Sequence, residues 1–259
     1  MKTLITQVGA LCAFLIGTTL HAAGHGPIFG LATPINPAAG WSLDVSQMGR
    51  AYAGGVGSML RAELGYGVTE NFKLAISGPA VFTSERLPPA RVSAFTPMGG
   101  DFEVLALWRF HRQDLDVGKR FESTAIVGLL QPGPQRAAGP GPGFYTAAVT
   151  GLASRSNYVW LGSGYQRYRD GSGIVSYSAV YGYRPQSWRT DYPRWDWRVF
   201  GEMTGEIYQV LRSSTHQVFA GPSVLGVYKN YAVSAGVQLP VHRESSERVR
   251  FAINVAYFF

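Results

Sequence analysis

The sequence predicts an all-β fold, an antiparallel up-and-down transmembrane β-barrel of about 12 strands, with 10 or 14 strands also open. Charged residues make up only 15 % of the 259 residues, against roughly 25 % in soluble domains. After residue 23, no stretch approaches the roughly 20 consecutive apolar residues of a membrane helix. The chain ends "RVRFAINVAYFF", which alternates with the period of a β-strand. Of the structures that satisfy every backbone hydrogen bond in lipid, a closed barrel is the one that remains.

Residues 1–22 are predicted to be a signal peptide, cut after Ala22 or Ala23. The segment has an early Lys2, an uncharged apolar run over residues 8–20 and small residues at its end, which is typical of secretory signals. The single cysteine, Cys12, lies inside it, so the mature barrel is expected to have no disulfide. Residues 23–40 are predicted to be an N-terminal lead in the periplasm, and residues 41–259 to form the barrel as one domain.

The strands follow from alternation between turn-rich segments. The clearest pair is the hairpin in "MLRAELGYGVTENFKLAISGP", residues 59–79, with its turn at residues 69–71. The other ten predicted strands cover residues 41–49, 101–110, 119–130, 143–153, 158–168, 174–183, 195–206, 216–228, 231–241 and 248–259. The Pro- and Gly-rich stretches "RLPPARVSAFTPMGG" and "QPGPQRAAGPGPG" are predicted loops. Both lie on the outer side if Phe259 is periplasmic, whereas "RPQSWRTDYPR" is long for an inner turn.

One face of each strand is predicted to line the lumen. In "YAVSAGVQLPV", for example, Ala, Ser, Gly and Gln alternate with apolar residues, and these small or polar side chains suit an interior. The same parity gives a candidate permeation path lined by charges of both signs and one amide: Arg61, Glu63, Lys73, Glu103, Arg109, Arg198, Glu202, Glu206, Arg250 and Asn254, with Glu122 and Asp196 also inward. Pairing across the lumen would offset their desolvation and narrow or close the passage.

The opposite face is predicted to contact lipid, through residues such as Leu64, Phe251, Ile253 and Val255. Aromatic residues close to the predicted inner turns are expected to form an interfacial girdle: Tyr66, Phe72, Trp108, Phe110, Tyr158, Trp160, Tyr181, Tyr183, Trp195, Trp197, Tyr228, Tyr231, Tyr257 and Phe259. The alternating last strand, with Tyr257 and a final Phe259, resembles the C-terminal signal by which bacterial outer-membrane barrels are recognised and inserted. The resemblance implies the bacterial outer membrane as location and the barrel assembly machinery as a partner.

A narrower resemblance lies in "GHGPIFGLATPINPAAGWSLDVSQMGR", "FGEMTGEI" and "YAVSAGVQLPV". These segments are similar to the family of outer-membrane transporters named after the meta-pathway of phenol degradation. The resemblance implies a porin-like channel for passive passage of small hydrophobic or aromatic compounds. It brings no catalytic residues, and we expect no enzyme activity and no cofactor.

Two other functions stay open. The barrel could be a non-conducting binding or accessory component of a system for substrate response or metal handling. It could also be a lipid-modifying enzyme, because His216 and His242 fall near the predicted outer rim, where a Ser–His hydrolytic site is possible. The sequence contains no metal-ligand spacing such as H-x-x-x-H and no nucleophile elbow.

A metal site at the N-terminus depends on the cleavage position. A cut after Ala22 leaves the amine of Ala23, two backbone amides and the imidazole of His25 to supply four nitrogens in a plane, which suits Cu(II) or Ni(II). A cut after Ala23 removes one amide and the site with it. The alternative is a flexible lead with no metal.

The formal net charge is +7. Arginines in the predicted outer loops suit the phosphates of lipopolysaccharide, and nucleic acid is not an expected partner. Outer-membrane lipid, lipopolysaccharide and small hydrophobic solutes are the expected partners, and the barrel is expected to be a monomer.

Overall fold

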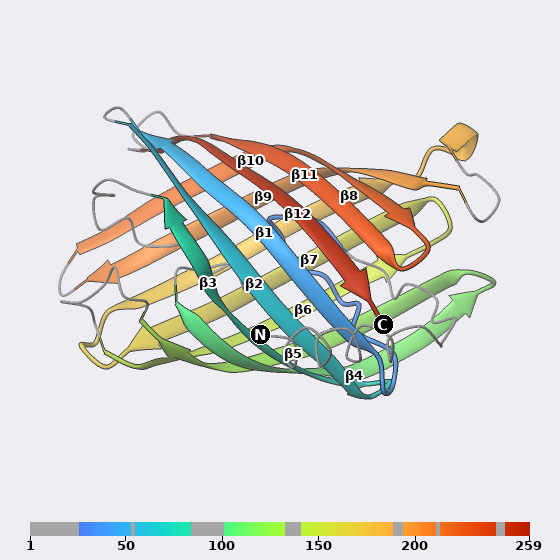
Figure 1. Ribbon diagram of the computed structural model, residues 1–259, viewed down its shortest axis with the longest axis horizontal. Helices are drawn as coiled ribbons and strands as arrows, with labels where there is room; N and C mark the ends of the chain where they lie inside the picture. Colours follow the sequence, from blue (N-terminus) through green and yellow to red (C-terminus); the bar gives the residue numbers. More distant parts are fainter. Residues whose placement is uncertain are drawn as a thin grey trace, which may run out of the picture.

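The chain forms a closed, fully antiparallel barrel of twelve strands in which each strand pairs with its sequence neighbours and β1 pairs with β12 (Figure 1). The computed structural model describes residues 26–52, 55–83, 101–132, 141–188, 194–210, 213–241 and 247–259. The strands are β1 (Trp41–Tyr52), β2 (Gly55–Thr69), β3 (Phe72–Thr83), β4 (Phe102–Asp116), β5 (Lys119–Gln131), β6 (Gly143–Ala153), β7 (Asn157–Tyr168), β8 (Gly173–Tyr183), β9 (Asp196–Val210), β10 (Ser213–Tyr228), β11 (Tyr231–Pro240) and β12 (Glu247–Phe258). The predicted fold and its count of twelve are confirmed.

The two ends of the barrel wall meet along β1 and β12, in register from Ser42 opposite Phe258 to Ala51 opposite Val249. Trp41 and Phe259 extend this ladder, since each donates its backbone N–H to the carbonyl of the other, at 2.8 and 3.1 Å. Closure leaves neither strand as an open edge, which is the condition for a sheet to cross lipid.

Several strands run further than the sequence predicts. β1 and β2 stay paired up to Tyr52 opposite Gly55, and β9 and β10 up to Val210 opposite Ser213, where loops were expected over residues 50–57 and 207–215. The pairing continues because the backbone N–H and C=O groups of each strand find antiparallel partners on the other strand along these residues. Within the predicted outer loops, residues 84–100, 133–140 and 242–246 lie outside the described residues.

The hairpin of β4 and β5 projects beyond β3, as Figure 1 shows in green. Its pairing continues to Asp116 opposite Lys119, whereas β3 stops pairing with β4 at Trp108. On the other side, β6 follows β5 as far as Arg120. Residues 111–118, predicted as an inner turn, are therefore mostly strand. The long inner connection after β8 contains η2, a single 3-10 turn (Gln186–Trp188).

The two faces of the wall differ as predicted. On β12, Ile253 and Val255 are 51 % and 47 % exposed, whereas Ala252 and Ala256 are at most 1 % exposed. The same alternation holds on β11, where Leu239 is exposed and Gln238 is buried. The exposed apolar side chains point outward and form the lipid-facing surface of a transmembrane barrel. Within the described ranges, the structure has no helix long and apolar enough to cross a membrane.

Two aromatic residues that were predicted to belong to the interfacial girdle lie in the interior of the barrel. Tyr158 and Trp160 on β7 are 9 % and 3 % exposed and pack in the main core, while Val159 and Leu161 between and beside them are exposed. The prediction was wrong for these two because both faces of this part of β7 are apolar, so alternation did not tell inside from outside. Other girdle aromatics, including Trp108 and Tyr231, are exposed on the outside.

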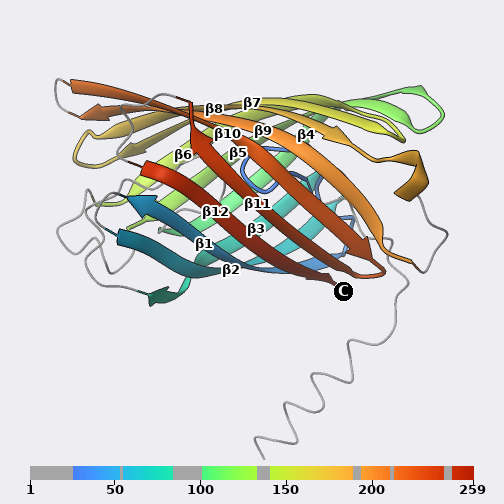
Figure 2. The same cartoon turned by 90° about the horizontal axis from the view of Figure 1, so that it is seen from above.

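The N-terminal segment lies inside the barrel. Figure 2 shows the blue segment between the barrel walls, and Ile28, Phe29 and Leu31 are at most 5 % exposed. The expectation of a periplasmic lead is therefore corrected for residues 28–36. Two glycines of the wall make room: a Cβ at Gly236 would meet the Phe29 ring at 2.7 Å, and one at Gly67 would meet the Pro37 carbonyl oxygen at 1.9 Å.

Candidate functional site: the barrel interior

The inward charges of the barrel are arranged as ion pairs, some between adjacent strands, one within β9 and others between strands that are not adjacent. Arg61 lies 2.7 Å from Glu103, and both side chains are at most 8 % exposed. Three further pairs are Lys73 with Glu63 at 3.1 Å, Arg109 with Glu122 at 3.0 Å and Arg198 with Asp196 at 3.0 Å. Opposite charges at this distance compensate for the loss of water around each group.

Arg250 on β12 is a buried cation held by two glutamates. Its Nη1 and Nη2 donate to the two carboxylate oxygens of Glu206 at 2.8 and 3.1 Å, and its Nε donates to Glu247 at 2.7 Å. The guanidinium also lies over the ring of Phe219, 3.6 Å from its centroid. Arg50 on β1 lies 2.7 Å from Glu247. Two arginines and two glutamates therefore form one network on the inner face of the wall.

Glu202 on β9 has a different kind of partner. Its carboxylate accepts the backbone N–H groups of Ile28, Phe29 and Gly30 at 3.0, 2.8 and 2.7 Å. The hydroxyl of Ser223 donates to the same carboxylate. Three consecutive N–H groups on one buried carboxylate fix the N-terminal segment to the middle of β9 by charge-assisted hydrogen bonds.

From Glu202 the segment passes around the inner wall toward β1. The N–H of Leu31 donates to Ser178 on β8 at 3.3 Å, and Thr33 donates to Glu122 on β5 at 3.1 Å. Trp160 donates its indole N–H to the hydroxyl of Thr33 at 3.1 Å. Residues 28–33 therefore contact walls on several sides of the lumen.

An aromatic cluster lies beside this segment. The rings of Tyr158 and Trp160 stack with centroids 5.5 Å apart, and Phe200 lies 6.2 Å from Trp160. Arg198 stands over the Tyr158 ring at 5.4 Å. Trp160, Val180 and Glu202 occupy one row across β7, β8 and β9, so the cluster borders the carboxylate that holds the segment.

The structure therefore places all ten predicted lumen residues, and all of them lie on the inward face. Asn254 accepts the hydroxyl of Ser46 at 2.8 Å and donates to Asp44 at 3.2 Å. Whether these residues line a route of passage stays a prediction.

Other predicted residues lie elsewhere. Tyr257 and Phe259 stack on the outer surface with centroids 5.8 Å apart. His216 is exposed on the outer surface and bonds Tyr177 at 2.8 Å. Ala23, His25 and His242 fall outside the described residues. In the described part of the chain, no group of three His, Cys, Asp or Glu side chains is placed to hold a metal ion.

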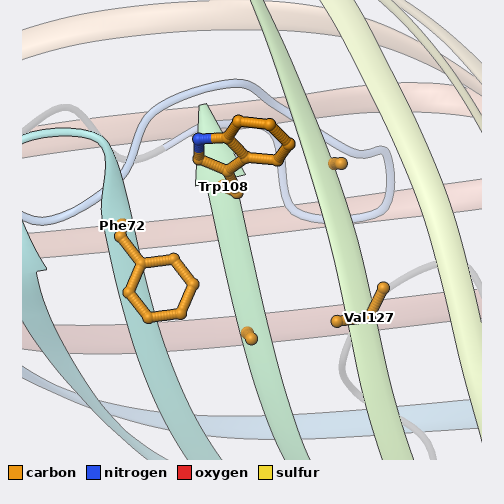
Figure 3. Close-up of a pocket in the computed structure, with 5 residues that line it drawn as sticks. Phe72, Trp108 and Val127 are labelled. Carbon is orange, nitrogen blue, oxygen red and sulfur yellow. The ribbon is translucent and has the colours of Figure 1, made fainter. Parts of the chain in front are cut away.

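The described part of the outer wall includes an apolar hollow of about 420 Å³, lined by Phe72, Ala106, Trp108, Ala125 and Val127. Figure 3 shows Phe72, Trp108 and Val127 on neighbouring strands. The other lining residues, Ala106 and Ala125, have small side chains and leave space between the larger ones. The hollow faces outward, where lipid chains lie against a transmembrane barrel. It is therefore separate from the interior site.

Sequence reasoning missed the N-terminal segment as part of the site. One signal was present: Ile28, Phe29, Leu31 and Ile35 are too apolar for a solvent-exposed lead. Alternation carries no information about this segment, because it is not a strand.

A closed twelve-stranded barrel with an apolar outer belt and a charged, paired interior defines the chain as a β-barrel of the bacterial outer membrane. No family model and no curated protein matches the sequence. Among solved structures, it is similar to an outer membrane channel from Pseudomonas putida F1, with 13 % identity over 91 % of this chain and 100 % of that chain at a TM-score of 0.53. The KdgM porin, with 13 % identity over 84 % and 99 %, has a TM-score of 0.47. LpxR from Salmonella typhimurium, with 11 % identity over 84 % and 100 %, has a TM-score of 0.45. These likenesses concern the fold.

Proposed function

We propose that the protein is an outer-membrane channel for passive passage of small hydrophobic or aromatic compounds. The observation that carries the proposal is the inner wall, where charged and polar side chains follow successive strands inside a wall whose outer face is apolar. A barrel built only for stability has no need of this many inward charges, since well-packed apolar residues of similar volume are often equally stable. The aromatic cluster of Tyr158, Trp160 and Phe200 supports an aromatic solute, because such rings pack favourably against one another.

In this structure the N-terminal segment occupies part of the interior. Residues 28–36 lie in the interior, and Arg61, Glu206 and Gln238 are at most 2 % exposed. Passage therefore requires the N-terminal segment to move, whereas the strands and their backbone ladders stay in place.

The test is reconstitution of the purified protein into planar lipid bilayers, with toluene or phenol added as a competitor. Discrete conductance steps that an aromatic solute blocks support the proposal. A matched control is the Asn254→Arg variant, which adds an inward charge beside Asp44 and should change the ion selectivity of any current that passes through the lumen. Currents with unchanged selectivity in that variant contradict passage along the inner wall.

A second candidate is the non-conducting accessory barrel, and the filled interior favours it. The absence of conductance in bilayers for both the natural protein and the Asn254→Arg variant would support this second function. Lipid hydrolysis in detergent would support the third, the lipid-modifying enzyme.

A further inference from the structure

The carboxylate of Glu202 is bound by the protein's own chain in the way a binding site holds a ligand. Three backbone N–H groups and one hydroxyl, from Ser223, donate to it, and Glu202 is 2 % exposed. In the described part of the chain, the inward glutamates Glu63, Glu103, Glu122 and Glu206 each pair with Lys or Arg. Glu202 differs from them, because its donors there are backbone amides and a hydroxyl.

The apolar half of the site is the place of the Phe29 side chain. Ile28 and Phe29 form a buried cluster with Ala252, against which Met48 packs. The missing side chain of Gly236 leaves the space that the Phe29 ring fills. The segment therefore presents an aromatic ring and a set of N–H donors side by side, the ring in a recess of β11 and β12 and the donors against Glu202 of β9.

Withdrawal of the segment would leave a buried carboxylate without its donors, and a buried unpaired charge is strongly unfavourable. An occupant that replaces the segment must therefore bring N–H donors, and a positive charge makes those hydrogen bonds stronger. It must also fill the recess of Phe29 with a ring. An arylalkylammonium ion has both parts, whereas an aromatic carboxylate would place a like charge beside Glu202.

We infer that residues 28–30 are a self-ligand in a site for small aromatic cations, and that such a cation displaces the segment when it binds. The step from displacement of the segment to passage of a solute rests on the proposed function, whereas the binding of the cation does not.

The experiment measures how often the segment is seated, with a disulfide as the reporter. A Cβ at Gly162 would lie 3.1 Å from the Cβ of Leu31, close to the roughly 3.5–4.5 Å found in disulfides, so Leu31→Cys with Gly162→Cys should crosslink when the segment is seated. The chain's one natural cysteine, Cys12, lies in the predicted signal peptide. Diamide serves as oxidant in the folded, detergent-solubilised protein, and the remaining thiols are counted by labelling after denaturation. Each single-cysteine variant is the control for other crosslinks.

The probes are benzylammonium and benzoate at equal concentration. The fraction with a seated segment falls as 1/(1 + [L]/Kd), so benzylammonium at ten times its Kd should slow crosslinking about tenfold. Benzoate should leave the rate unchanged. In the Glu202→Gln background, the side-chain carbonyl oxygen can still accept hydrogen bonds from the backbone amides of the segment. Because the negative charge is gone, the effect of benzylammonium on the crosslinking rate should be lost.

Equal slowing by both probes, no slowing by benzylammonium, or an effect that survives Glu202→Gln would each overturn the inference. Heat-modifiable mobility on gels confirms that each variant is folded, so that a misfolded variant is not scored.

Planar bilayers separate the two proposals. Protection by benzylammonium together with silent bilayers refutes passage and leaves the binding site standing. Conductance that is the same in the disulfide-locked and reduced protein refutes the segment as the closure and leaves the channel standing.

Discussion

Replacing Arg250 with methionine should destabilise the barrel strongly, because it removes the central cation of a buried ion network. Arg250 makes three hydrogen bonds of 2.7 to 3.1 Å to Glu206 and Glu247. In the variant, Arg50 still lies 2.7 Å from Glu247 and the hydroxyl of Tyr208 still donates to Glu206. The carboxylate of Glu206, 0 % exposed, is the one that loses its bidentate guanidinium partner.

The expected loss is that of one broken buried pair, about 3–5 kcal/mol in the free energy of unfolding. The measurement is urea titration of the protein refolded into phospholipid vesicles, followed by tryptophan fluorescence. Arg112→Met is the matched control, since Arg112 lies 3.4 Å from Asp114 with both side chains well exposed, and its loss should be at most about 1 kcal/mol. Adding Glu206→Gln to Arg250→Met should restore part of the stability, because the buried charge is then gone. Equal losses for Arg250→Met and Arg112→Met would refute the reasoning.

Three further predictions concern the lipid face, assembly and the N-terminus. Ile253→Arg on the lipid-facing side of β12 should lower stability by about 2–4 kcal/mol near the membrane midplane, whereas Asn254→Arg on the inner face should leave heat-modifiable folding intact; equal tolerance of both would contradict the register. Removal of Phe259 should slow insertion in cells more than it lowers stability, and a normal insertion rate for that deletion would contradict an assembly role. If the signal is cut after Ala22, the mature protein should bind one Cu(II) with a visible d–d band that disappears in His25→Ala, and N-terminal sequencing that starts at Gly24 would exclude the site.

The strand pattern of this protein is a local property, and the sequence was enough to determine it. Ile253 and Val255 face outward and Ala252 and Ala256 inward because successive side chains of a strand point to opposite faces. The same rule placed Arg250 and Glu206 inside, and the twelve strands followed from counting such segments between Pro- and Gly-rich loops. The rule failed at Tyr158 and Trp160, because both faces of the strand are apolar there and alternation does not indicate which face is inside.

Which groups meet inside the barrel was decided by the tertiary structure alone. The amides of Ile28 and Gly30 reach Glu202 across 174 and 172 residues of sequence, and the indole of Trp160 reaches Thr33 across 127. Contacts at such separations depend on closure of the wall, which brings distant strands around one lumen. The sequence shows which side chains point inward, but their partners are fixed only when the closed barrel sets the distance between opposite walls.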